Sequence, residues 1–179
     1  MSESELIKGC QRQDSKIQNL VYKTYAPKVF GTCKRYMKDR ERAEEMAMNT
    51  FLTVFGKIGQ FKGEGSFEGW ILRIAVNCCL MELRKKTNFE AELKPDSLSL
   101  SVENTVTSEL AERDIEKMLS ILPEGARIVF NLYAVEGYKH AEIAAQLGIS
   151  EGTSKSQLNY AKEKLKKTFF NTDSKINEL

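Results

Sequence analysis

Apolar positions along most of the chain recur every three to four residues, the spacing of an amphipathic α-helix. In its first part this spacing predicts helices near residues 4–11, 15–37, 40–58 and 67–86. In its second part it predicts helices near residues 108–121, 124–135, 139–147 and 151–169. No stretch alternates apolar and polar residues over a useful strand length, and the chain has only three prolines. The pattern therefore predicts an all-α protein.

Capping and breaking residues fall where these helices should begin or end. Ser66 is placed to cap the helix near 67–86, and Pro123 suits the first turn of the helix near 124–135. Gly137 suits a helix end, where a left-handed residue is often needed. The boundaries thus agree with the apolar period.

A tight corner separates the helices predicted near 139–147 and 151–169. Gly148 permits the left-handed backbone of a sharp turn, Ile149 can fill the angle between the helices, and Ser150 or Thr153 can cap the second one. The second helix has inward apolar positions at i, i+3 and i+7, namely Leu158, Ala161 and Leu165. The arrangement predicts a helix-turn-helix.

The outward arc of that second helix carries polar and basic side chains. They are Lys155, Ser156, Asn159, Tyr160 and Lys162. Such an arc suits a DNA major groove, because basic residues contact phosphates while Ser, Asn or Lys contact base edges. A helical hairpin whose lysines only face solvent is the alternative. Ser154 interrupts the inward face, and its hydroxyl is expected to bond back to a carbonyl of the preceding turn.

Charge divides the chain more clearly than its small net value of +2 suggests. Residues 1–86 hold 16 basic and 10 acidic residues, whereas residues 87–108 hold one lysine and four acids. Residues 109–179 hold 10 basic and 11 acidic residues. The middle segment is rich in Ser and Thr and lacks a clean helical period, so we expect a largely extended linker between a basic and a near-neutral domain.

Several functional classes are disfavoured by composition. No apolar run is long enough to cross a bilayer and the N-terminus lacks a signal-peptide core, so a cytoplasmic location is expected. The four cysteines show no CxxC spacing and there is one histidine, so we expect buried or half-buried thiols, no metal site and no cofactor. No nucleophile–base group or phosphate loop is found, so an enzyme is not expected.

The residues of the second domain, from LPEGARIVF to AKEKLKK, resemble region 4 of bacterial RNA polymerase sigma factors of the sigma-70 family. The resemblance implies that the helix-turn-helix reads the upstream (−35) promoter element. It assigns DNA contact to Lys155, Ser156, Gln157, Asn159, Tyr160 and Lys162. The usual T-V-K/R-S-R-L run is here Thr153-Ser154-Lys155-Ser156-Gln157-Leu158, so an aliphatic residue and one arginine are replaced.

The stretch RAEEMAMNTFLTVFGKIGQF is similar to region 2.2 of the same family, which docks on the β′ clamp helices of core polymerase. The resemblance assigns polymerase contact to Glu45, Met46, Met48, Asn49, Phe51 and Leu52. Met48 and Asn49 replace the usual Gln and acidic residue, which makes this surface more apolar and less charged.

The stretch FKGEGSFEGWILRIAVNCCLMELRKK resembles regions 2.3 and 2.4, which recognise and melt the downstream (−10) element. The resemblance assigns these contacts to Phe61, Lys62, Phe67, Trp70, Arg73, Asn77 and Arg84. Aromatic faces reward unstacked bases by about 1–3 kcal/mol each. For Phe67 and Trp70 a place in the core is the competing interpretation, and for Trp70 it is the better one.

A two-domain layout without an intervening region 3 domain resembles the extracytoplasmic-function (ECF) group of this family. It implies a region 2 domain at 1–86, a linker at 87–108 and a region 4 domain at 109–179, the last touching the polymerase β flap. It also implies promoter DNA and an anti-sigma protein as partners. A stand-alone helix-turn-helix regulator that binds duplex DNA as a dimer is the alternative function.

Overall fold

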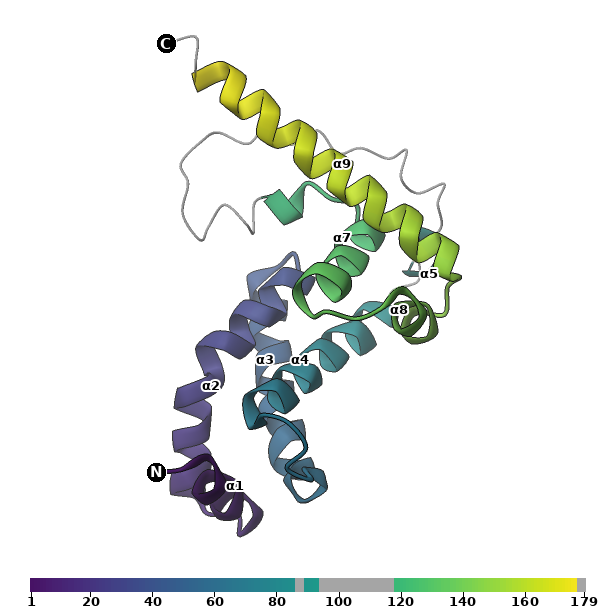
Figure 1. The fold of residues 1–179 in the computed structure, drawn as a ribbon. Helices are drawn as coiled ribbons and strands as arrows, with labels where there is room; N and C mark the ends of the chain where they lie inside the picture. The colour runs from purple at the N-terminus through teal and green to yellow at the C-terminus, as the bar shows by residue number, and fades with distance from the viewer. Residues whose placement is uncertain (86–88, 94–117, 177–179) are drawn as a thin grey trace. The chain divides into compact units, whose positions relative to one another are not determined.

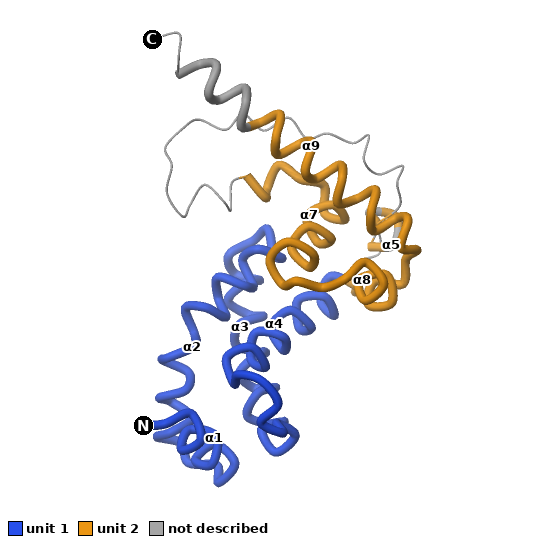
Figure 2. The backbone as a smooth tube through the Cα atoms, in the orientation of Figure 1, with its two compact units in different colours: residues 1–83 blue, residues 84–179 orange. Residues whose placement is uncertain are grey.

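The computed structural model describes residues 1–85, 89–93 and 118–176, and all regular structure within them is helical (Figure 1). They fall into two compact units, residues 1–83 and 84–179 (Figure 2). The predicted all-α fold with two helical domains is confirmed.

Unit 1 contains three long helices after a short one. They are α1 (Glu3–Gln11), α2 (Ser15–Tyr36), α3 (Arg40–Lys57) and α4 (Phe67–Arg84), with a 3₁₀ turn η1 (Ile58–Gln60) after α3. Side-chain oxygens cap the N-termini: Ser2 for α1, Asp14 for α2 and Asp39 for α3. Ser66 caps α4 as predicted, since its Oγ accepts from the Gly69 N–H at 3.0 Å.

The core of unit 1 lies between α2, α3 and α4. Its fully buried side chains include Val21, Tyr36, Val54, Ile71 and Leu80. Each buried aliphatic side chain stabilises the fold by about 1.5–3 kcal/mol relative to its exposed state. One face of each helix therefore serves the core and leaves the opposite face for other contacts.

Unit 2 contains α5 (Phe89–Leu93), α7 (Glu124–Phe130), η3 (Asn131–Val135, a π-helical segment), α8 (His140–Leu147) and α9 (Glu151–Ile176). A core between α7, α9 and the residues before α7 includes Leu119, Leu122, Ala126, Ala161 and Leu165. The helix predicted over 124–135 changes to π geometry after Phe130, and α9 continues beyond the expected end at 169.

The expected linker differs from its prediction where it is described. Residues 89–93 form α5, with Phe89 and Leu93 buried, whereas an extended segment was expected from 87 to 108. The rest of that linker and most of the helix expected near 108–121 lie outside the described residues; residues 118–120 are helical. Two apolar side chains four residues apart explain α5, because they share one helix face.

Candidate nucleic-acid and protein interfaces

The corner between α8 and α9 has the geometry of a helix-turn-helix. Gly148 ends α8 with φ of 69°, a left-handed value that favours glycine, and the Ile149 N–H donates to the Ala144 carbonyl at 3.1 Å. The Ser150 Oγ accepts from the Thr153 N–H at 3.0 Å, so Ser150 caps α9. The predicted corner and cap are both confirmed.

The outward arc of α9 lies in unit 2 largely as expected. Lys155, Asn159 and Lys162 are exposed, and Ser156 and Tyr160 are half-buried. Lys155, Asn159 and Lys162 point away from the core, whereas Tyr160 packs against the core cluster that contains Ala161 and only part of its side chain is available for contact. The arrangement presents hydrogen-bonding groups and positive charge together, as contact with a nucleic acid requires.

Gln157 does not lie on this arc, which corrects its assignment to DNA contact. Its side chain is buried, and its Nε2 donates to the Leu93 carbonyl of α5 at 3.0 Å. The lost arginine of the family pattern is therefore replaced by an internal hydrogen bond. This hydrogen bond could not be predicted from the sequence, because nothing near Gln157 indicates that the Leu93 carbonyl needs a donor.

Ser154 is buried as expected, but its hydroxyl has a different partner from the predicted carbonyl. Its Oγ lies 2.9 Å from Nδ1 of His140, the first residue of α8. The His140 ring is stacked on that of Tyr133, with ring centroids 4.7 Å apart. The sequence interpretation gave neither residue a role; the polar Ser154 on an inward face was the signal that a partner exists.

A cluster of aromatic rings in unit 1 brings together the three aromatic residues of the expected melting surface. Phe61 lies 5.4 Å from Phe67 and 5.3 Å from Trp70 between ring centroids, and Phe67 and Trp70 are stacked at 5.9 Å. Phe67 is fully buried, whereas Phe61 and Trp70 are half-buried. Phe67 is therefore a core residue that supports the other two, which corrects its assignment to base contact.

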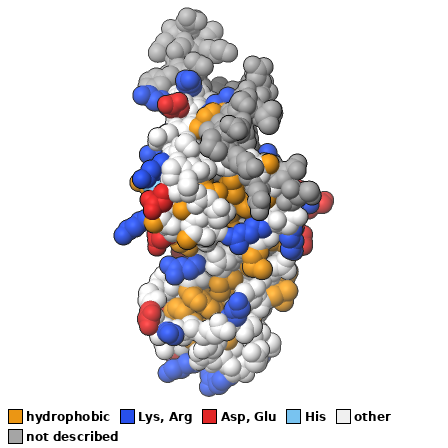
Figure 3. Space-filling model, turned by 90° about the vertical axis from the view of Figure 1, so that its right-hand side faces the viewer, with side chains coloured by type: hydrophobic (Ala, Val, Ile, Leu, Met, Phe, Trp, Pro, Cys, Tyr) orange, Lys and Arg blue, Asp and Glu red, His pale blue; other side chains and the backbone are white. Residues whose placement is uncertain are grey.

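The polar residues assigned to the same surface are at the surface of the molecule. Lys62, Arg73, Asn77 and Arg84 are exposed. Between Phe61 and α4 the loop turns through two glycines with positive φ, Gly63 at 77° and Gly65 at 87°. Figure 3 shows hydrophobic side chains at the surface of unit 1, in the lower part of the view, with Lys and Arg side chains around them.

Helix α3 divides the residues assigned to polymerase contact into two sets. Glu45, Met48 and Leu52 are exposed and Asn49 is half-buried, with Leu52 at 65 % and Met48 at 52 % of their full accessibility. Met46 and Phe51 are 2 % exposed, so they belong to the core, which corrects their assignment. The exposed residues follow each other at i, i+3, i+4 and i+7 on one face.

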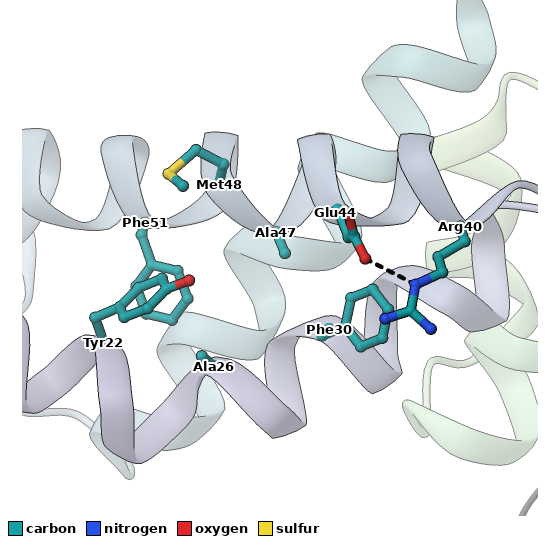
Figure 4. A pocket seen from close by; sticks show the side chains of 8 residues that line it. All are labelled: Tyr22, Ala26, Phe30, Arg40, Glu44, Ala47, Met48 and Phe51. Carbon is teal, nitrogen blue, oxygen red and sulfur yellow. Dashed lines mark hydrogen bonds and ion pairs between the residues drawn. The ribbon is translucent and has the colours of Figure 1, made fainter.

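A pocket of about 400 Å³ opens between α2 and α3 beside this face (Figure 4). The rings of Tyr22 and Phe51 lie at one end, 4.9 Å apart between centroids, and the exposed Arg40–Glu44 ion pair lies at the other. Its lining residues are Tyr22, Ala26, Phe30, Arg40, Glu44, Ala47, Met48 and Phe51. The sequence interpretation assigned no role to the α2 residues, because their helix carries no matching motif.

The pKa shifts of the cysteine thiols differ: those of Cys79 and Cys10 are raised, whereas a hydrogen bond with Cys79 lowers the pKa of Cys33. A hydrogen bond with the Cys33 thiol, together with burial, raises the pKa of Cys79, and burial raises that of Cys10. Such thiols stay protonated near neutral pH and are poor nucleophiles. Cys78 is half-buried and its neighbour Cys79 is buried, because adjacent residues cannot share one helix face. All four thiols are free, and the buried ones have a packing role.

Family models match both units of the chain. The model of sigma-70 region 2 matches residues 21–89, and that of sigma-70 region 4 matches residues 112–165. No helix in the described part of the chain is long and apolar enough to cross a membrane.

Curated relatives match over nearly the whole chain. The RNA polymerase sigma-H factor of Pseudomonas aeruginosa is 25 % identical over 178 residues, covering 92 % of each chain. The ECF RNA polymerase sigma-E factor of Haemophilus influenzae is 28 % identical over 177 residues, covering 91 % of this chain and 93 % of its own.

Two solved structures share the fold. CnrH, in complex with the cytosolic domain of CnrY, is 18 % identical with a TM-score of 0.53 and covers 94 % of this chain and 97 % of its own. The sigma factor RpoE from Bartonella quintana, in complex with the anti-sigma factor NepR, is 20 % identical with a TM-score of 0.54, covering 84 % of this chain and 95 % of its own. With both region models and the curated relatives in agreement, the chain belongs to the sigma-70 family of RNA polymerase sigma factors, in its ECF group.

Proposed function

We propose that this sigma factor binds core RNA polymerase through unit 1, recognises the −10 element with residues of α4 and the loop before it, and reads the −35 element with α9. In this proposal residues 1–86 bind polymerase and open DNA, residues 87–108 connect, and residues 109–179 read the upstream element. The observation that carries the proposal is the coexistence of an exposed basic helix-turn-helix with a separate apolar face on α3.

The polymerase-binding surface consists of the exposed residues of α3 and the adjoining pocket. Met48 and Leu52 expose apolar area that a helical partner can bury, and the pocket beside them can receive a protruding side chain. Glu45 and the Arg40–Glu44 pair supply polar contacts at the edge. This combination of an apolar centre and a charged edge is typical of protein interfaces.

DNA opening is assigned to the half-buried Phe61 and Trp70, with Lys62, Arg73, Asn77 and Arg84 contacting the backbone or bases. Phe67 packs against both rings and holds them in place, so the exposed part of each ring is available for contact with an unstacked base. Differential binding of melted over duplex DNA supplies the energy, and no covalent chemistry is required. Sigma factors are regulators that bind DNA, not enzymes.

An anti-sigma protein is the regulatory partner that we propose for this chain. Two structural neighbours of this fold are complexes, one of them with a named anti-sigma factor. The apolar face of α3 is the surface whose coverage by such a partner would prevent polymerase binding.

Co-elution of the purified chain with core polymerase, without DNA, tests this function. We expect a stable 1:1 complex for the wild-type chain and a dissociation constant raised at least about tenfold for Leu52→Glu, because an unpaired charge enters an apolar contact. Met81→Glu is the matched control, since Met81 on α4 is 63 % exposed and receives the same charge. Tight duplex binding by the chain alone, without any polymerase complex, would instead favour the stand-alone regulator.

The outward arc of α9, which we call the reading face, is tested separately with the double variant Lys155→Ala and Asn159→Ala. Both side chains are exposed on α9, so the fold and polymerase binding should survive while binding of the upstream element weakens. Normal transcription by this double variant from a promoter that depends on the upstream element would contradict the assignment.

A further inference from the structure

A four-residue cluster joins three segments of unit 2 at the start of α9. The His140 ring at the beginning of α8 stacks on Tyr133 of η3, with ring centroids 4.7 Å apart and an angle of 23° between the planes. His140 Nδ1 and Ser154 Oγ form a hydrogen bond of 2.9 Å. Lys162 Nζ lies 5.6 Å from the centroid of the Tyr133 ring, within the range of a cation–π contact.

The hydrogen bond explains why a hydroxyl is tolerated inside the helix-turn-helix. Ser154 is fully buried in the first turns of α9, on the same side of the helix as the apolar residues Leu158, Ala161 and Leu165. A buried hydroxyl without a partner is destabilising, whereas two apolar side chains of similar shape at both positions are nearly neutral. His140 and Ser154 therefore satisfy each other's hydrogen bonding, and replacing only one of them leaves the other without this partner.

The same bond restrains the orientation of α9. A hydrogen bond is directional, so it restricts sliding and rotation of one helix against another more than an aliphatic contact does. Lys155 and Ser156 follow Ser154 directly, so their direction depends on how this turn is held. At the start of α8, the N–H of Lys139, the residue before His140, donates to Glu142 Oε2 at 2.7 Å. This hydrogen bond fixes the first turn of α8, which carries His140.

The Tyr133 ring also restrains Lys162, which lies further along the reading face than Ser156. Tyr133 is 39 % exposed and contacts both the His140 ring and the Lys162 ammonium. A free lysine side chain loses much rotational freedom when it binds a phosphate. A lysine already held over an aromatic ring loses less, and its contact with DNA is correspondingly stronger.

We propose that His140 and Tyr133 are positioning residues for promoter binding: His140 fixes the first turns of α9 through Ser154, and Tyr133 holds Lys162 for contact with a DNA phosphate. Neither residue lies on the reading face itself. The proposal rests on the proposed function, because it takes α9 to be the helix that enters the DNA.

The first test is a double-mutant cycle on full-length protein assembled with core polymerase. The variants are His140→Phe, which keeps a ring against Tyr133, Ser154→Val, and the two combined; Ala145→Ser, at an exposed position of α8, is the control. The quantities measured are the dissociation constant for a promoter that depends on the upstream element, the dissociation constant for core polymerase, and the melting temperature.

We expect each single change to weaken promoter binding about fivefold, with polymerase binding unchanged, because one hydrogen bond is lost and its partner stays unsatisfied. The combined variant should recover most of the lost affinity, which reveals coupling between the two positions. Single variants with lower melting temperature but wild-type promoter affinity would reduce His140 to a structural role and overturn the proposal.

The second test measures how promoter affinity falls with salt. Tyr133→Ala should reduce the slope of log K against log salt by about one, as Lys162→Ala should, because one phosphate contact is lost. Tyr133→Phe keeps the ring and should restore the slope. An unchanged slope for Tyr133→Ala would overturn the part of the proposal that concerns Lys162.

Lys155→Ala combined with Asn159→Ala belongs in the same assay. If it leaves promoter binding unchanged, the reading face is wrongly assigned and the proposed function fails at that point. If it weakens binding while the His140 and Tyr133 variants behave as wild type, only the present inference fails.

Discussion

The side chain of Gln157 connects α9 with α5 through one buried hydrogen bond. Its Nε2 donates to the Leu93 carbonyl at 3.0 Å, and no solvent reaches the side chain. Removal of the amide leaves that carbonyl without this donor and leaves a small cavity. Both effects destabilise unit 2 and neither concerns DNA directly.

We therefore expect Gln157→Ala to lower the free energy of unfolding by about 1–3 kcal/mol. Thermal or urea unfolding followed by circular dichroism measures this change. Asn159→Ala, two residues away but exposed, should change stability by no more than about 0.5 kcal/mol. Equal stability of Gln157→Ala and wild type would show that the hydrogen bond to α5 is not made in solution.

At the level of single residues, sequence predicted exposure well where one helix face decides it. Lys155, Asn159 and Arg73 are exposed because they lie outside the helix face that the periodic apolar residues define. Gln157 lies three residues after Ser154 and four before Ala161, so helical spacing places it beside the buried face; its partner on α5, more than 60 residues away, could not be predicted. Contacts distant in sequence leave no periodic signal.

At the level of elements, the corner between α8 and α9 depends on one glycine. Gly148 has φ of 69°, and a side chain in this conformation costs about 1–2 kcal/mol. No atom lies near enough to obstruct an added Cβ there, so the cost is one of backbone conformation alone.

We expect Gly148→Ala to destabilise the protein by about 1 kcal/mol or more. Gly152→Ala is the matched control, since Gly152 lies in the first turn of α9 and an added Cβ would meet Ser150 Oγ at an ordinary 3.5 Å. There alanine should be neutral or stabilising by up to about 1 kcal/mol, because it is the better helix former. Unfolding curves of the two variants should therefore move in different directions; a shift of both in the same direction would contradict the argument.

Most elements could be predicted from sequence, because helix caps and apolar periods agree at α2, α3, α4 and α8. The π geometry of η3 and the short α5 were missed. Each of these segments has five residues, which are too few to show a period of their own.

At the level of the whole molecule, different surfaces are assigned to different steps of initiation. In the proposed function the face of α3 binds polymerase, the ring cluster at Trp70 opens DNA and the arc of α9 reads the upstream element. We expect substitutions on one of these surfaces to leave the other two largely unchanged, since the three lie on different helices.

Trp70→Ala should lower open-complex formation severalfold, because a stacking surface of about 1–3 kcal/mol per base is lost. Permanganate footprinting of a promoter measures the opening, and co-elution with core polymerase should be unchanged. Trp70 also stacks on Phe67, so its removal should lower the melting temperature as well. Trp70→Phe keeps an aromatic face and should recover part of both losses; opening by Trp70→Ala at the wild-type rate would exclude Trp70 from melting.

The region 2 and region 4 motifs led to this proposed division of roles from sequence. They did not show that α3 has a buried and an exposed face, because a family pattern does not distinguish a buried residue such as Phe51 from an exposed one such as Leu52. The α2 side of the pocket carries no motif at all and needed the structure.

The dual use of α9 limits how promoter preference can change over generations. Leu158, Ala161 and Leu165 hold the helix in the core while Lys155, Asn159 and Lys162 face outward from the same turns. Insertion of one residue between them would rotate the following part of the helix by about 100° and turn its outer face inward. If α9 reads the upstream element as proposed, we expect new promoter preferences to arise by substitution on the outer arc, because a change in helix length would also disturb the core.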